Sequence, residues 1–397
     1  MNSIENINFK GQNVLIRVDF NVPLNSDYEI TDYSRIVETI PTIQKVVESG
    51  GRPILISHLG RPKGEINPNF SLIKLIPYLK KHLNYKIKFI HNCIGEEVKN
   101  SIKNLKNKEI LLLENLRFYK EESNGDISFS KKLAELAEIY INDAFGTSHR
   151  KHSSTFYVAK FFKDNRYIGL LIKKEIERLN KILITGKKPI TVILGGSKIS
   201  TKIDVIDNLI EKVDNIIIGG GMAYTFSKAL GGEIGNSMIE KSKVNLAKNL
   251  IDKAKKFKCN LSLPVDSINS ISFTNDSETY SGSIYSIKKN FIGMDIGEKT
   301  RLKYDKIILN SKTILWNGPM GVFEFDKFSK GTEFIIKSVL EATKKGAYSL
   351  IGGGDSIAAI KKYNFKTNSL NISTGGGAML KFLEGSKLDV IDEILSD

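Results

Sequence analysis

Cysteine, proline and tryptophan are scarce in this chain, with two, nine and one among 397 residues. Cys93 and Cys259 lie far apart, which argues against a disulfide framework and indicates free thiols in a reducing compartment. No apolar run approaches the roughly 20 residues that span a bilayer, and the first residues, MNSIENINFKGQN, lack the apolar core of a signal peptide. We therefore expect a cytoplasmic protein without a membrane partner.

Several common enzyme signatures are also missing. The glycine clusters match neither the phosphate-binding pattern GxxxxGK[ST] nor the dinucleotide pattern GxGxxG, which disfavours a nicotinamide dinucleotide. The chain has no nucleophile elbow, and neither cysteine lies in an activating motif. Chemistry through a covalent nucleophile is therefore not expected.

Negative charge is in deficit, since 59 lysines and arginines against 44 acids give a net charge of +15. The positive excess suits an anionic partner. Most of this excess is explained, however, by lysine being the usual residue at solvent-exposed positions of this chain. A nucleic-acid partner would need a basic stripe or interleaved aromatics, whereas these lysines are dispersed, so we expect none. Steep loss of DNA or RNA binding between about 50 and 200 mM salt would support that alternative. Arginine is different, because seven of its nine copies precede residue 167, and clustered guanidinium groups suit phosphate or carboxylate.

Short apolar runs alternate with amphipathic stretches along the whole chain. We interpret as buried strands the runs 13–20, 52–59, 86–92, 109–116, 138–145, 189–196, 215–223, 260–266, 313–319, 348–356 and 370–378. Helical spacing is present in the stretches 34–51, 71–83, 128–138 and 168–186. This alternation predicts parallel sheets covered on both faces. The expected fold is α/β, with two doubly wound, Rossmann-like domains, 1–167 and 187–385, joined by a hinge helix over 168–186.

Polar and basic residues follow the expected strands of the first half. The strand ends read DFN (19–21), HLGR (58–61), ENLRF (114–118) and DAFGTSHR (143–150), and Arg35 opens the first helix. A single His or Arg at such a position more often forms its hydrogen bonds within the protein than with a ligand. Ligands of open α/β sheets bind beyond the carboxyl ends of the strands, so together these residues predict a pocket for a small polyhydroxy anion.

Glycines follow the expected strands of the second half, in GGSK (195–198), GGG (219–221), GGGDS (352–356) and TGGGA (374–378). Glycine lets main chain approach a ligand closely, and a following helix offers N–H groups to phosphate. One such cluster is often only a tight turn, but four with Lys198, Lys202 and Asp355 among them favour a nucleotide polyphosphate. Asp355 is the expected Mg²⁺ ligand, because Mg²⁺ usually takes one or two carboxylates plus substrate phosphates.

An anion pocket in one half and a nucleotide site in the other predict phosphoryl transfer across a closing cleft, by positioning and electrostatic stabilisation. The motifs that carry these sites occur in the order VDFNVP, SHLGRP, ENLRF, DAFGTSHR, GGSKISTK, LWNGPMGVFE, GGGDS and STGGGA. Together, from about residue 5 to about residue 386, they closely resemble the phosphoglycerate kinase family. The resemblance implies reversible, direct in-line transfer between 1,3-bisphosphoglycerate and ADP, giving 3-phosphoglycerate and ATP, with Mg²⁺. It also implies that the tail, 386–397, packs back on the first domain.

The resemblance further implies roles for individual residues of the first domain. Asp19 and Asn21 would orient the glycerate, and Arg35 with Lys198 would stabilise the phosphoryl group in flight. The remaining substrate-binding residues would be His58, Leu59, Gly60, Arg61, Arg117 and Arg150, with the imidazole and guanidinium groups on the non-reacting phosphate.

For the second domain the implied roles concern the nucleotide. Lys202 would hold its phosphates, Glu324 its ribose and Asp355 its metal. Gly375, Gly376 and Gly377 would present N–H groups to the transferring phosphoryl. The other nucleotide-binding residues would be Gly195, Gly196, Gly219, Gly220, Gly293, Gly353, Gly354 and Ser356.

The sequence also bears on one surface segment and on the oligomeric state. The segment 267–286 is poorer in apolar residues than its surroundings and is expected to be a looser surface segment, and the protein is expected to be a monomer. The main alternative is a non-catalytic two-lobed binding protein. It explains the basic pocket but not a second glycine- and lysine-rich site with a metal-type aspartate, and a coupled assay for ATP-dependent phosphorylation of 3-phosphoglycerate separates the two.

Overall fold

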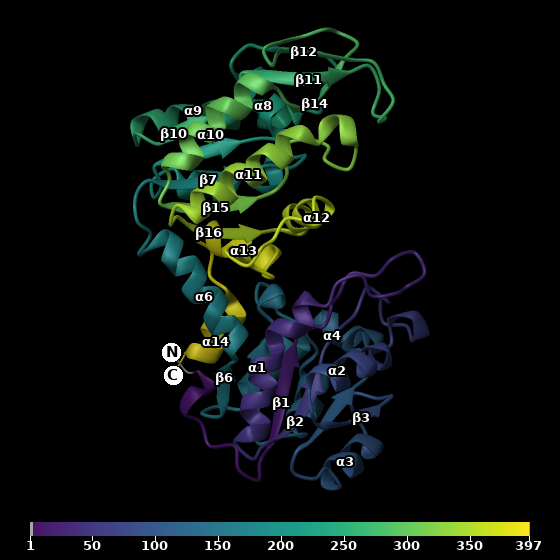
Figure 1. The fold of residues 1–397 in the computed structure, drawn as a ribbon. Helices are drawn as coiled ribbons and strands as arrows, with labels where there is room; N and C mark the ends of the chain where they lie inside the picture. Colours follow the sequence, from purple (N-terminus) through teal and green to yellow (C-terminus); the bar gives the residue numbers. More distant parts are fainter. Residues whose placement is uncertain (1–2, 397) are drawn as a thin grey trace. The chain divides into compact units, whose positions relative to one another are not determined.

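A computed structural model describes residues 3–396. The chain forms two compact units (Figure 1). The first unit runs to Ile176 and takes in the chain from Lys387 onward, and the second is Glu177–Ser386. The long helix α6, Leu170–Leu183, contains the boundary. No helix among the described residues is both long and apolar enough to cross a membrane.

The first unit is built on a six-stranded parallel sheet in the order β3-β4-β2-β1-β5-β6. Its central strands are buried on both faces and, apart from Arg17 of β1, mostly apolar, as a sheet covered by helices requires. The strands are β1 Asn13–Val18, β2 Arg52–Ile56, β3 Lys86–Ile90, β4 Glu109–Leu113, β5 Ile139–Asp143 and β6 Arg166–Ile168. The strand order reverses around β1, where doubly wound folds bind ligands.

Helices connect these strands, and one more helix arrives from the far end of the chain. The connecting helices are α1 Ser34–Glu48, α2 Ile76–His82, α3 Glu96–Lys103, α4 Lys120–Asn124 and α5 Ile127–Ala134. The last helix, α14 Asp389–Leu395, lies beside β6 (Figure 1). The buried Val390, Ile391 and Ile394 pack α14 on the first unit, and Arg166 Nη1 of β6 lies 2.9 Å from Glu393 Oε1 of α14.

The second unit repeats the plan with the strand order β10-β8-β7-β15-β16-β17, again parallel throughout. The strands are β7 Ile190–Leu194, β8 Asn215–Ile218, β10 Asn260–Ser262, β15 Thr313–Asn317, β16 Tyr348–Gly352 and β17 Asn371–Ile372. The helices are α7 Ile203–Leu209, α8 Met222–Ala229, α9 Val244–Lys256, α10 Glu298–Asn310, α11 Lys330–Lys344, α12 Gly354–Lys362 and α13 Gly377–Leu383. Trp316 of β15 is fully buried in the core on this sheet.

Two small sheets join the second unit, and they correct one part of the expectation for residues 267–286, which lie largely at the surface but form regular strands. β11 Asp266–Ser270 pairs antiparallel with β12 Thr279–Ser283 and with β14 Ile292–Ile296, and β13 Ser286–Ile287 pairs with β9 Glu233–Ile234. The segment is polar yet regular, because its main chain pairs as strands, and its buried Ser267 and Asn269 hydrogen-bond each other at 2.8 Å. The run 260–266 is likewise not one strand, since β10 ends at Ser262.

The expected strands otherwise exist but overshoot at their carboxyl ends. Residues 19–20 and 57–59 leave the ladder after β1 and β2, and most of the run 370–378 forms the loop between β17 and α13. These residues have strand-like composition because they are buried, not because they pair. The overshoot therefore marks the loops that carry the candidate site.

Candidate active site

The first unit gathers its candidate residues around the loop that follows β2. The Gly60 N–H donates to Asn21 Oδ1 at 2.9 Å, and Arg117 Nη1 donates to the Gly60 carbonyl at 2.6 Å. Asn115 Oδ1 accepts from Leu59 N at 3.2 Å. Loops after three neighbouring strands are thereby fixed to one another, which orders the rim before any ligand arrives.

A basic pocket of about 240 Å³ opens at this rim. Its lining residues are Arg61, Lys63, Arg117, Ser123, Arg150 and His152. None of the six is acidic, so the cations have no carboxylate partner within the pocket. Burial and the nearby Arg17 and Arg150 lower the pKa of Arg117 to about 10. Burial and the surrounding arginines also lower the pKa of His152 to about 4, so its imidazole is neutral at physiological pH.

The remaining substrate candidates lie around or behind the pocket rather than in its lining. Arg35, half-buried at the start of α1, forms a short ion pair with the buried Asp19 carboxylate. His58 is 2 % exposed and Leu59 is fully buried. The Leu59 side chain therefore packs in the core, and only its main chain can serve a ligand.

A buried polar network behind the pocket was not predicted. Arg17, only 1 % exposed, contacts His58 Nδ1 through Nη2 at 3.0 Å and donates to Ser154 Oγ through Nε at 2.8 Å. Ser154 in turn hydrogen-bonds the buried Glu122 carboxylate, at 2.7 Å through Oγ and 2.9 Å through N. The sequence signal was an arginine inside an otherwise apolar strand, NVLIRV, which needs a partner when buried.

In the second unit, Lys202 ties two strand ends together. It is 7 % exposed, and Nζ donates to the Gly195 carbonyl and, at 2.9 Å, to the Asn317 carbonyl. Burial lowers the pKa of this lysine to about 8, and the nearby Asp355 opposes the shift. A buried ammonium held by main-chain carbonyls keeps a positive charge at the end of the β7–β15 pair.

The glycines here are needed because main chain packs against main chain. A Cβ on Gly195 would lie 1.9 Å from the Pro319 carbonyl oxygen, and one on Gly220, where φ is +68°, would lie 2.6 Å from Gly196 N. The Gly293 position is closed differently, since a Cβ would meet the Tyr224 hydroxyl at 2.1 Å. The close main-chain packing places Gly195, Gly196, Gly219 and Gly220 at one rim. There Gly219 N donates to Leu194 O and Gly220 N donates to Met320 O, at 2.9 Å each.

The first turn of α12 brings the third group of candidates to the same rim. Ser356 Oγ accepts from Gly318 N at 2.7 Å, so α12 is anchored to the loop after β15. Asp355 and Gly354 are exposed, and a Cβ on Gly354 would meet no atom within 4 Å. This side of the helix is open to a ligand.

Five further candidates, Lys198, Glu324, Gly375, Gly376 and Gly377, lie in loops of the second unit or at the start of α13. Lys198 and Glu324 have exposed side chains. Gly376 has a φ of +49° and precedes α13, which begins at Gly377, while Gly375 N donates to Ser373 Oγ at 3.1 Å.

The loop Asn317–Pro319 is the site element that sequence reasoning left unassigned. Its main-chain atoms contact the residues after β7, the Lys202 ammonium and the Ser356 hydroxyl. The motif LWNGPMGVFE marked the place, but the contribution is made by main chain, which a search for reactive side chains does not find.

The residues present fit a Mg²⁺–nucleotide rather than a metal held by the protein alone. Among residues 3–396, no three His, Cys, Asp or Glu side chains are grouped so as to hold a metal ion. Asp355 offers one exposed hard carboxylate in the first turn of α12. Because Mg²⁺ commonly combines one or two carboxylates with substrate phosphates and waters, a single carboxylate is sufficient.

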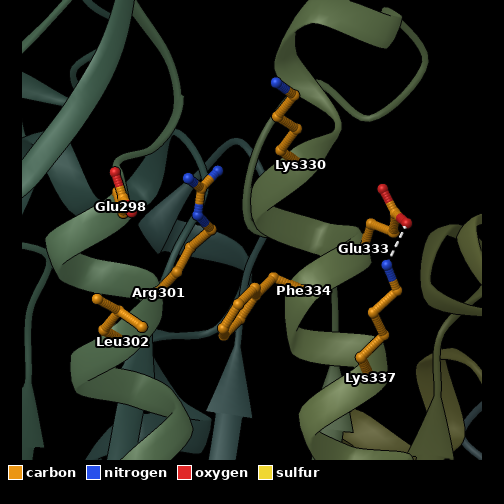
Figure 2. Close-up of a pocket in the computed structure, with 7 residues that line it drawn as sticks. All are labelled: Glu298, Arg301, Leu302, Lys330, Glu333, Phe334 and Lys337. Carbon is orange, nitrogen blue, oxygen red and sulfur yellow. Dashed lines mark hydrogen bonds and ion pairs between the residues drawn. The ribbon is translucent and has the colours of Figure 1, made fainter.

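A separate groove of about 290 Å³ lies between α10 and α11 (Figure 2). Figure 2 shows Phe334 lying between Arg301 of α10 and the Glu333–Lys337 ion pair of α11, which is 2.7 Å long. None of the candidate residues lines this groove. It is therefore a different surface from the rim of the sheet.

Two doubly wound units, one with an acid-free arginine pocket and the other with glycine-rich strand ends and an exposed carboxylate, define an enzyme of the phosphotransferase class. The family model for phosphoglycerate kinase matches residues 4–386. Phosphoglycerate kinases from Chlorobium luteolum and Chlorobium chlorochromatii are 49 % and 47 % identical over 386 residues, covering 97 % of each chain. The chain belongs to the phosphoglycerate kinase family.

Solved structures agree with this result. The phosphoglycerate kinase of Coxiella burnetii superposes with a TM-score of 0.87 at 39 % identity, covering 99 % of this chain and 98 % of that one. The enzyme of Pyrococcus horikoshii has a TM-score of 0.84 at 30 % identity with the same coverage. The expected fold class and family are confirmed. The chain is a kinase that transfers a phosphoryl group between 1,3-bisphosphoglycerate and ADP.

Proposed function

We propose that the two substrates bind on different units. The phosphoglycerate binds in the basic pocket of the first unit, and the nucleotide binds at the glycine-rich rim of the second. The observation that carries this division is the pocket lining, which has three arginines, a lysine and a histidine but no acid. Such a lining favours a small, highly charged anion, whereas main-chain N–H groups and one carboxylate suit Mg²⁺ with a polyphosphate.

Within the first unit, Arg61, Arg117 and Arg150 bind the non-reacting phosphate, because their guanidinium groups have no carboxylate partner in the pocket. Asp19 and Asn21 orient the glycerate hydroxyl and carboxylate. Arg35 acts on the transferring phosphoryl group, since its ion pair with Asp19 fixes its direction.

Within the second unit, Lys202 and the residues of the α12 first turn bind the nucleotide phosphates. Asp355 provides the protein ligand to Mg²⁺, which would neutralise charge on those phosphates when bound. Lys198 acts on the transferring group, and Glu324 hydrogen-bonds the ribose. The side chains of Lys198, Glu324 and Asp355 are exposed and therefore accessible to a ligand, which supports their assignment. Lys202 is buried, and its assignment rests on its position at the strand ends that form the glycine-rich rim.

The division is tested by calorimetric titration of Arg61→Met and Arg117→Met with each substrate. Each variant should lose about tenfold or more in affinity for 3-phosphoglycerate, because a hydrogen bond to a charged group contributes about 1.5–3 kcal/mol, and neither should change its affinity for Mg-ADP. Arg52→Met is the matched control, since Arg52 opens β2 at the opposite end of the sheet. Equal losses for both substrates would contradict separate sites.

The metal assignment is tested by measuring ADP affinity with and without Mg²⁺. Mg²⁺ should tighten binding to the unaltered protein and have little effect on Asp355→Asn. Asp204→Asn is the control, because Asp204 is also an exposed first-turn aspartate, on α7. Full Mg²⁺ enhancement in Asp355→Asn would show that another group binds the metal.

We further propose that the protein acts as a monomer in the cytoplasm. The two scattered cysteines, both free in the structure, support a reducing compartment. Light scattering during size-exclusion chromatography tests the monomer, and a mass near twice 44.4 kDa would contradict it.

A further inference from the structure

Arg17 is the least expected cation of the first unit. Its guanidinium lies inside the sheet core on β1, and its hydrogen bonds go to the Val18 carbonyl, to Ser154 Oγ at 2.8 Å and to His58 Nδ1 at 3.0 Å. It does not line the basic pocket. Its part in the reaction must therefore pass through its partners.

The chemistry of arginine fixes the direction of each of these hydrogen bonds. A guanidinium only donates and stays protonated in proteins, so His58 Nδ1 must accept and cannot carry a hydrogen. The neutral His58 ring then carries its hydrogen on Nε2. Ser154 Oγ likewise accepts from Arg17 and gives its own hydrogen to Glu122 Oε1, 2.7 Å away.

The surroundings of His58 also disfavour a second proton. The charged or titratable groups that face it are Arg17 from β1, Arg35 from α1, Arg117 after β4 and His152 before the turn Ser153–Tyr157. All are cationic or neutral, and burial adds to their effect, so the His58 pKa lies well below its ordinary value. Among the described residues, none accepts a hydrogen bond from Nε2, so this donor remains for a ligand.

We propose that Arg17 is a positioning residue that locks His58 as a neutral imidazole with its hydrogen on Nε2, so that His58 donates one hydrogen bond to the anionic substrate. The proposal rests on the substrate site described above. A locked donor cannot accept a hydrogen bond, so it favours the fully ionised anion over a protonated one. It also avoids adding a further buried cation beside three arginines. Glu122, reached through Ser154, balances the charge of Arg17 inside the core.

The first test needs no variant of Arg17. The chain has five histidines, and ¹⁵N imidazole labelling with long-range ¹H–¹⁵N correlation distinguishes their tautomers, with His58→Gln assigning the signals. From about pH 5.5 to 8, around the ordinary histidine pKa of about 6.5, His58 should show an unprotonated Nδ1 and a protonated Nε2. An Nδ1–H tautomer, or an imidazolium at neutral pH, overturns the proposal.

The second test follows Arg17→Met and the charge-retaining Arg17→Lys. At about pH 8 the KM for 3-phosphoglycerate should rise about tenfold, the size of one lost hydrogen bond to a charged group, with kcat changed much less. The increase should shrink as pH falls, because an unlocked His58 can take up a proton and bind the anion. In a His58→Gln background this pH dependence should vanish.

The outcomes separate this inference from the proposed substrate site. If an Arg17 variant raises KM equally at all pH values while the His58 signals stay unmoved, Arg17 is only structural and the inference fails. If the tautomer is as expected but 3-phosphoglycerate does not shift the Nε2 signal, the substrate placement fails while the lock stands. Arg52→Met, another strand arginine, should leave the His58 signals unchanged.

Discussion

Raising the pH should weaken nucleotide binding through a single buried lysine. Lys202 is 7 % exposed, and its ammonium is held by two main-chain carbonyls. Burial lowers its pKa from 10.5 to about 8, with Asp355 acting in the opposite direction. The group therefore loses its proton within the range in which the folded protein can be assayed.

The size of the effect follows from that pKa. A group with a pKa of about 8 is about nine-tenths protonated at pH 7 and about one-tenth protonated at pH 9, so if phosphate needs the ammonium, the apparent Kd for Mg-ADP rises about tenfold, or about 1.4 kcal/mol. Stability moves the other way. Because the unfolded chain keeps the ordinary pKa, it binds more protons than the folded protein between about pH 8 and 10.5, and the free energy of unfolding rises with pH across that window by up to about 3 kcal/mol.

Calorimetric titration with Mg-ADP and chemical denaturation at the same pH values provide the assay. Affinity should fall while stability rises, a combination that general alkaline damage cannot produce. Lys202→Arg is the control, since arginine stays protonated and should bind Mg-ADP with nearly constant affinity over this range. Constant affinity of the unaltered protein up to about pH 9 would show that the phosphates do not depend on this ammonium.

Three further predictions concern single residues. Gly195→Ala should lower the melting temperature strongly, because the added Cβ would lie 1.9 Å from a main-chain oxygen. Gly354→Ala should melt like the unaltered protein, because no atom lies within 4 Å of the added Cβ, but it should bind ADP more weakly, because that Cβ occupies space proposed for the nucleotide. Equal ADP affinity would mean that the nucleotide does not approach Gly354. The His152 pKa is about 4 in the folded protein, so between about pH 6.5 and 4 the unfolded chain binds more protons at this residue than the folded chain does. The free energy of unfolding should therefore fall by up to about 2 kcal/mol over this range, once solvent screening is allowed for. His152→Gln should make the free energy of unfolding less dependent on pH in this range, and an unchanged dependence would exclude His152 as its cause. Arg35→Ala should reduce kcat far more than Mg-ATP affinity, and equal losses would contradict its role on the moving phosphoryl group.

Sequence reasoning reached the first-unit pocket because parallel strands end at one edge of a sheet. Arg61, Arg117 and Arg150 follow different strands, and the structure places all three around one pocket. It could not reach Arg17, whose partners Ser154 and His58 lie 137 and 41 residues away along the chain. Which side chain meets a buried strand arginine depends on how distant loops pack, and no local pattern contains that information.

In the second unit, too, the positions of site residues after strands could be predicted, whereas the contacts set by tertiary packing could not. The glycine clusters and Lys202 were found from their places after strands, but the contacts of the lysine to main-chain carbonyls were not. The polar segment 267–286 was misjudged because serine and asparagine usually mark loops, whereas here they satisfy each other inside a small sheet. Polar composition correctly indicated exposure for most of this segment, but it could not show that the segment pairs as strands.

The two sites share one physical principle although their residues differ. Arg117, His152 and Lys202 all have lowered pKa values, and burial is the first cause in each case. Burial therefore makes the charged form of each group less favourable in free energy than it would be in water. A phosphate placed beside them raises their pKa and recovers part of that cost. Substrate binding and stability are thus linked in both units, because the groups that destabilise the folded chain by itself are those that an anion stabilises.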